Sequence, residues 1–84
     1  MKVDYHKSFI KQYERLSAKI QTRFDERLKL FMKKPFSVEL NNHLLHGKYA
    51  GCRSINITGD FRAIYEILSI GVRFLYIDKH SNLY

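Results

Sequence analysis

The chain has 84 residues, 45% of them hydrophobic, with one proline and four glycines. This length suits one domain and leaves too little material for two cores. No apolar run approaches the roughly 20 residues that cross a bilayer, and the polar start MKVDYHKSF lacks the apolar segment of a signal peptide. The single cysteine, Cys52, excludes an internal disulfide and a cysteine-based zinc site. These features predict a cytoplasmic protein with no membrane partner.

The charge is strongly positive. Fifteen Lys and Arg residues oppose eight Asp and Glu residues, which gives a formal net charge of +7. Such an excess on a small domain attracts phosphates without sequence preference and suits an acidic protein partner. In the first half of the chain the cations lie between apolar residues at helical spacing, so an ordinary solvated helix face also explains them.

The first half predicts a strand followed by two helices. Residues 3–5 alternate in character, as in a short strand. Ser8 is expected to cap a helix that runs to about Leu16, and Ser17 to cap a second helix, although the two could be continuous. Pro35 should end the second helix. One apolar stripe runs along that helix at intervals of three or four residues, namely Ile20, Phe24, Leu28, Phe31 and Met32.

The second half predicts three strands after a connector at residues 36–49. Residues 53–57 alternate, so Ile55 and Ile57 should face one side with Arg53, while Cys52, Ser54 and Asn56 face the other. Thr58-Gly59-Asp60 has turn chemistry, and residues 61–68 and 72–78 should form a hairpin around Ser69-Ile70-Gly71. The order predicts an α+β fold, with a two-helix hairpin on one face of an antiparallel sheet.

Four short boxes in the second half carry a family resemblance: His43–Gly47, Gly51–Arg53, Gly59–Tyr65 and His80–Tyr84. They match, in order, a His-Pro-Leu-x-Gly box, a Gly-x-Arg strand start, a Gly-Asp-x-Arg-x-x-Tyr hairpin and a Thr-His-x-x-Leu-aromatic tail. The chain thus resembles the RelE/ParE toxin superfamily of type II toxin–antitoxin systems, closest to its YafQ-like mRNA interferase branch. The resemblance implies one RelE-like toxin domain over residues 1–84.

The function that this resemblance implies is ribosome-dependent cleavage of mRNA. Such toxins enter the A site of the 30S subunit, where rRNA surrounds the message, and the ribose 2′-OH attacks the adjacent phosphate. The reaction is expected to need no metal and no small-molecule cofactor. The expected partners are mRNA on the ribosome and a cognate antitoxin protein that neutralises the basic site.

The resemblance also implies the catalytic residues. His80 matches the tail histidine and His43 the histidine of the first box, and both are expected to transfer protons. Asp60 matches a hairpin aspartate that would orient a histidine. A loop role for the histidines and a turn role for Asp60 are the structural alternatives.

The RNA-binding residues follow from the same boxes. Arg62 and Arg53 are expected to contact phosphate through their planar guanidinium groups, and Lys79 to neutralise developing charge. Tyr84 would stack on a base. For Arg62, the competing interpretation is an ion pair with Glu66. Arg53, Arg62 and Tyr84 are expected to converge on one small region with Asp60 and the two histidines.

Some positions depart from the branch and keep other functions open. Ser54 and Asn56 stand where the branch has an acidic residue and a second histidine, and neither can replace an ionisable group. Leu44 replaces a proline, and Asp78-Lys79 replace Gly-Thr. The chain could therefore be a ParE-like, non-catalytic inhibitor of DNA gyrase, or an inactivated basic RNA-binding homologue.

Overall fold

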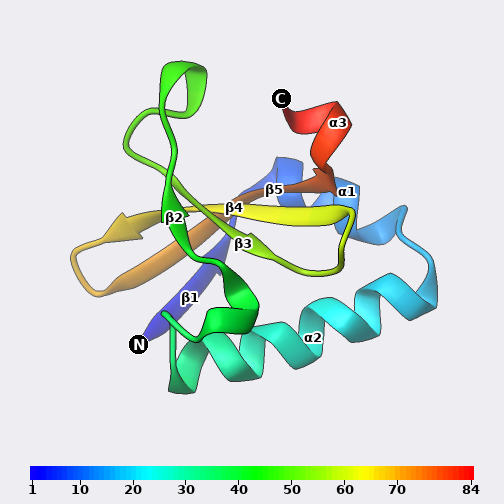
Figure 1. Cartoon of the computed structure of the whole chain (residues 1–84), viewed down its shortest axis with the longest axis horizontal. Helices are drawn as coiled ribbons and strands as arrows, with labels where there is room; N and C mark the ends of the chain where they lie inside the picture. Colours follow the sequence, from blue (N-terminus) through cyan, green and yellow to red (C-terminus); the bar gives the residue numbers. More distant parts are fainter.

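A five-stranded sheet forms the centre of the computed structural model, which describes all 84 residues (Figure 1). In chain order the helices and strands are β1 (Lys2–Tyr5), α1 (Lys7–Glu14), α2 (Ala18–Lys33), β2 (His43–Leu44), β3 (Arg53–Asn56), β4 (Phe61–Leu68), β5 (Gly71–Lys79) and α3 (His80–Leu83). The strands lie in the order β1-β5-β4-β3-β2. None of the helices has the length and apolar character needed to span a membrane.

The predicted α+β fold is confirmed, with one strand pairing that differs. Strands β2 to β5 pair antiparallel as expected, but β1 runs parallel to β5. Parallel neighbours require a crossover connection, and both helices lie between β1 and β5 in the chain. β4 has the predicted bounds, β3 ends one residue early, and β5 is one residue longer at each end. The two-residue strand β2 and the helix α3 are not predicted by the sequence patterns.

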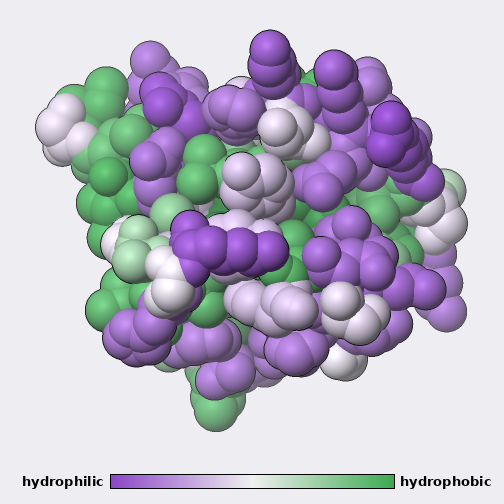
Figure 2. Space-filling model, turned by 90° about the horizontal axis from the view of Figure 1, so that it is seen from above, coloured by the Kyte–Doolittle hydropathy of each residue, from purple (hydrophilic) through white to green (hydrophobic).

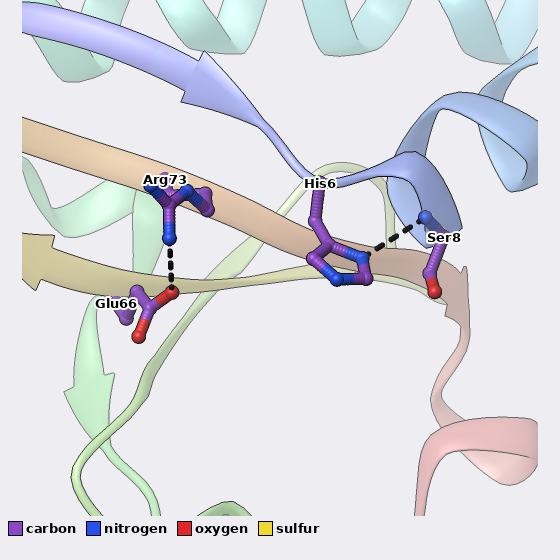
Figure 3. A network of polar contacts seen from close by, with 4 residues as sticks. All are labelled: His6, Ser8, Glu66 and Arg73. Atoms are coloured by element: carbon purple, nitrogen blue, oxygen red, sulfur yellow. Dashed lines mark hydrogen bonds and ion pairs between the residues drawn. The ribbon is translucent and has the colours of Figure 1, made fainter.

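The two long helices begin at different kinds of cap. The prediction that Ser8 caps α1 is wrong. The cap is His6, whose Nδ1 accepts a hydrogen bond from the backbone N–H of Ser8 at 3.1 Å (Figure 3). An imidazole nitrogen without a proton accepts such a bond as a carboxylate would. Ser17 caps α2 as predicted, since its Oγ accepts from the N–H of Ile20. The helices are separate, and α2 ends two residues before Pro35.

The larger core lies between the sheet and helices α1 and α2. Phe74 of β5 is completely buried at its centre, and its ring centroid lies 5.4 to 6.1 Å from those of other aromatic rings. These rings come from β1, both helices and β4, and they belong to Tyr5, Phe9, Phe24, Phe31 and Tyr65. Ile55 and Ile57 join this core, which confirms the predicted faces of β3.

A smaller cluster lies on the opposite face of the sheet. Leu45, Ile64 and Leu83 are buried there, with Tyr49 and Tyr76 packed against them. Figure 1 shows α3 and the loop after β2 standing on the side of the sheet away from α2. Figure 2 looks onto that side, where hydrophilic side chains cover most of the surface. The sheet therefore has one face closed by helices and one face that carries loops and polar groups.

Strand β5 changes phase at a β-bulge. Tyr65 pairs with Phe74 and Ile64 with Tyr76, so Leu75 has no partner on β4. Because side chains alternate along a strand, one extra residue moves all later side chains to the opposite face. Phe74 accordingly lies in the larger core, whereas Tyr76 packs on the smaller cluster.

Replacing Phe74 by alanine should come close to unfolding the protein. Loss of a buried phenylalanine costs about 3–5 kcal/mol, and a domain of this size has a total stability of only about 4–13 kcal/mol. Urea unfolding followed by circular dichroism measures the loss. Ile67→Ala, at a residue of the same sheet that is 68% exposed, should change stability by about 0.5 kcal/mol or less. Equal midpoints for the two variants would contradict the central role of Phe74.

A methyl group at Gly71 should disturb the pairing of β1 with β5. Gly71 lies opposite Lys2, and an added Cβ would overlap the backbone of Lys2, whereas a Cβ at Gly59 meets nothing within 4 Å. We expect Gly71→Ala to lose about 1–3 kcal/mol of stability and Gly59→Ala to lose much less. Hydrogen exchange of the β1 amides should accelerate in Gly71→Ala alone. Unchanged exchange there would mean that the backbone accommodates the methyl group and that the pairing of β1 with β5 is not disturbed.

Candidate active site

A cleft of about 310 Å³ opens on the face of the sheet that carries the smaller cluster. Its walls come from the segment around β2, from the neighbouring strands β3 and β4, and from α3. Four residues predicted for the site lie in it together. The full lining is Asn41, His43, Leu45, Ser54, Arg62, His80 and Tyr84.

His43 is held at the start of β2 in a defined tautomer. Its Nδ1 lies 2.8 Å from the carbonyl oxygen of Asn41. A carbonyl only accepts hydrogen bonds, so Nδ1 carries the proton and Nε2 of the neutral ring keeps its lone pair. Asn41 presents this carbonyl from a left-handed backbone conformation with φ 44°, which asparagine adopts more readily than most residues. His43 is thus arranged to accept a proton.

A hydrogen-bond network fixes the segment that carries His43. The side-chain amide of Asn42 donates to the Pro35 carbonyl at 2.9 Å and to the Tyr65 hydroxyl at 2.7 Å. Nε of Arg53 donates to Oδ1 of Asn42 at 2.8 Å. Burial raises the pKa of Tyr65, against smaller opposing effects of Asn42 and Arg53, so its hydroxyl stays protonated. The end of α2, the connector and the sheet are joined by this one amide.

His80 begins α3 and extends the hydrogen bonding of the sheet. Its backbone N–H donates to the Asp60 carbonyl at 2.8 Å. Its ring lies 4.7 Å from the ring of Tyr84, centroid to centroid. The short helix is held by the buried side chain of Leu83, whose carbonyl accepts from the Tyr49 hydroxyl at 2.9 Å. His80 and Tyr84 both remain exposed at the rim of the cleft.

Arg62 places a cation in the cleft without an acidic partner. Its Nη1 donates to the carbonyls of Thr58, Gly59 and Phe61, at 2.9 to 3.2 Å. Nε and Nη2 make no such bond and remain for a ligand. The alternative ion pair with Glu66 is wrong, because Glu66 pairs with Arg73, directly opposite on β5, at 3.4 Å (Figure 3).

Three predicted site residues lie outside this cleft, so the expected convergence is only partly seen. Arg53 is engaged by Asn42, and its guanidinium lies over the ring of Phe36. Asp60 lines a different depression, beside the start of α2, and reaches His80 only through its backbone carbonyl. Lys79 is exposed and does not line the cleft, although it directly precedes His80.

Sequence reasoning missed three residues of the cleft. Asn41 and Leu45 lie in the connector, where no periodicity indicates which side chains meet. Strand alternation correctly puts Ser54 on the face opposite Ile55, but it does not show that the residue belongs to the site. It was considered only as the loss of an ionisable group.

The chemistry of the cleft is that of proton transfer beside an anion. The two imidazoles can exchange protons with a ligand. The guanidinium, which has no carboxylate partner, can bind a negatively charged group. Nowhere in the chain do three or more His, Cys, Asp or Glu side chains gather closely enough to hold a metal ion.

Comparison with known proteins identifies the family. Residues 1–84 match the model of YafQ, the bacterial toxin of type II toxin–antitoxin systems. No curated protein matches the sequence. YafQ from E. coli strain BL21(DE3) has a similar structure, with a TM-score of 0.84 and 17% identity over 99% of this chain and 97% of that chain.

Two further solved structures share the fold. The YoeB/ParE toxin from Agrobacterium tumefaciens has a TM-score of 0.79 and 24% identity, covering 95% of this chain and 99% of that one. In the E. coli DinJ-YafQ toxin–antitoxin complex, the values are 0.79 and 17%, over 99% and 96%. These likenesses show the fold, and the family model covers the whole sequence. The chain therefore belongs to the YafQ family of toxins of type II toxin–antitoxin systems.

Proposed function

We propose that this toxin is a ribosome-dependent endoribonuclease that cuts mRNA in the A site. The observation that supports this most is the cleft that brings His43, Arg62, His80 and Tyr84 together. A gyrase inhibitor that works by surface contact has no need of two histidines beside a free guanidinium. The net charge of +7 favours RNA as the ligand. A protein that acts on ribosomes works in the cytoplasm.

The proposed reaction is an internal transfer of the phosphoryl group. The ribose 2′-oxygen bonds to the adjacent phosphorus, and the bond from phosphorus to the 5′-oxygen of the next nucleotide breaks. A base removes the proton of the 2′-OH, and an acid supplies one to the leaving 5′-oxygen. The products are a 2′,3′-cyclic phosphate and a free 5′-hydroxyl. The proton that the base takes up is matched by the proton that the acid gives. The proposal includes no metal or other cofactor.

The hydrogen bonds of the cleft residues indicate which residue acts as base, which as acid and which binds the phosphate. His43 is the base, because its Nδ1–H is bonded to the Asn41 carbonyl and Nε2 is left to accept. His80 is then the acid. Arg62 offers Nε and Nη2 to the phosphate, and Tyr84, 48% exposed, offers its ring to a base.

The three residues outside the cleft receive supporting roles. Asp60 positions His80 through its carbonyl, and Arg53 positions His43 through Asn42. Lys79 lies exposed beside His80 and adds to the attraction of RNA.

The second proposed partner is an antitoxin. One of the similar structures is the E. coli DinJ-YafQ toxin–antitoxin complex. By analogy, we propose that an antitoxin with acidic segments covers the basic surface of this toxin and blocks the cleft.

Replacing either cleft histidine should nearly abolish cleavage. His43→Gln and His80→Gln each remove one proton-transfer group, which is worth about 10²- to 10⁴-fold in rate. Primer extension on mRNA held in purified ribosome complexes measures the loss. His46→Gln is the matched control, since His46 is an exposed histidine outside the cleft.

Three other outcomes of the cleavage assay would contradict parts of the proposal. Full cleavage by both cleft variants would remove the histidines from the mechanism. Equal cutting of free RNA by the wild type would remove the ribosome. If the wild type cuts neither template, the nuclease proposal fails and gyrase inhibition becomes the function to test.

Arg62→Lys should keep the charge but lose the planar fork. A charge-assisted hydrogen bond contributes about 1.5–3 kcal/mol, so we expect cleavage to fall by about 10- to 100-fold. Arg73→Lys, which changes an arginine paired with Glu66 outside the cleft, should cleave as the wild type does. Both variants are assayed below their melting temperatures, because Arg62 also holds the β3–β4 turn. Equal rates for the two would show that Arg62 is only structural.

A further inference from the structure

Ser54 has a buried hydroxyl group with no hydrogen-bond partner. It is the one polar residue among the 15 buried residues of the chain, and none of its surface is exposed. Its Oγ makes no hydrogen bond within the protein. A buried polar group without a partner destabilises a folded protein by about 1–3 kcal/mol, and each such group in a native structure needs a reason.

The position of this hydroxyl is inside the cleft. Ser54 lines the cleft from β3, the strand between β2 and β4. It lies directly opposite His43 on β2 and Ile64 on β4. Residues opposite each other in a sheet point to the same face, and Arg62 shares the face of Ile64 because it is two residues away. The hydroxyl therefore lies between the strands that carry the imidazole of His43 and the guanidinium of Arg62.

The other unpaired buried atoms do not share this position. Nε of Arg27 and Oδ1 of Asn56 also lack a partner, but neither residue lines the cleft. At the rim of the same cleft, the side chains of His43, His80 and Tyr84 are exposed. The Ser54 Oγ is covered in the free protein, so a ligand reaches it only when neighbouring side chains shift. A hydroxyl can also rotate its hydrogen toward a new acceptor.

We propose that the Ser54 hydroxyl donates a hydrogen bond to a non-bridging phosphoryl oxygen of the bound RNA. This inference rests on the proposed function. The proton-transfer groups of the cleft must flank the phosphorus atom, and the floor between His43 and Arg62 is where its anionic oxygens meet the protein. Ser54 is thus a substrate contact, prepared in the free protein and satisfied only in the complex. The serine that replaces an acidic residue of the family is, in this interpretation, a functional group of its own.

The test compares Ser54→Ala with Ser69→Ala, a control at an exposed serine in the β4–β5 turn. Removing an unpaired hydroxyl should leave the melting temperature unchanged or raise it. Cleavage of mRNA in ribosome complexes should fall by about tenfold, the value of one hydrogen bond to a charged group. Binding to the same complexes, with a 2′-deoxynucleotide that prevents cleavage in the A-site codon, should weaken. Ser69→Ala should change none of the three.

The outcomes separate this inference from the proposed function. A melting temperature several degrees lower in Ser54→Ala would mean that the hydroxyl stabilises the free protein through a hydrogen bond. That result would overturn the inference. Wild-type rates and affinity in Ser54→Ala would also overturn it, while the nuclease function stood. If the wild type binds the ribosome complex without cutting, the nuclease function fails, and weaker binding by Ser54→Ala would still support the contact. Absence of both binding and cleavage in the wild type would overturn both proposals.

Discussion

The packing of aromatic rings around Phe74 is the interaction on which the rest of the structure depends. This one side chain contacts rings from β1, from both long helices and from β4. The strand that carries it continues directly into His80. β1 pairs with β5 from Gly71 to Phe74, and β4 pairs with it as far as Lys79, so the last residues of β5 have a fixed position relative to the β3–β4 turn. The hydrogen bond from the His80 N–H to the Asp60 carbonyl then fixes the candidate acid, although its imidazole is exposed.

The opposite face of the sheet shows how little apolar packing supports the cleft. Three buried side chains, those of Leu45, Ile64 and Leu83, form the cluster beside it. The polar groups around them depart from ordinary rules of stability, since Arg62 has no acidic partner and the Ser54 hydroxyl is buried and unpaired. Departures of this kind concentrate at functional sites, where groups are arranged for a ligand and not for the free protein. The helix-covered face supplies the stability that this arrangement lacks.

The elements with strong local signals could be predicted from the sequence. Periodicity and turn residues indicated β4, the β4–β5 hairpin and α2 with its Ser17 cap. What failed depends on contacts between distant residues: the parallel partner of β1, the short strand β2, and the expectation that Arg53 and Asp60 lie in the cleft. The prediction of the α1 cap failed for a chemical reason. Histidine accepts a hydrogen bond at that position only through a ring nitrogen without a proton, so it is not among the usual capping residues. Motif spacing did bring four of the seven expected site residues to one cleft.

The bulge at Leu75 restricts how the length of this chain can vary in evolution. Removal of one residue between Phe74 and His80 would restore simple alternation and turn every later side chain to the other face of the sheet. His80 would then face the helix-covered side, and its backbone would lose register with Asp60. Ser69, at the tip of the β4–β5 turn, is exposed and far along the strands from this point, so insertions should be tolerated there. Among homologues, gaps should therefore cluster at that turn and be absent from the second half of β5.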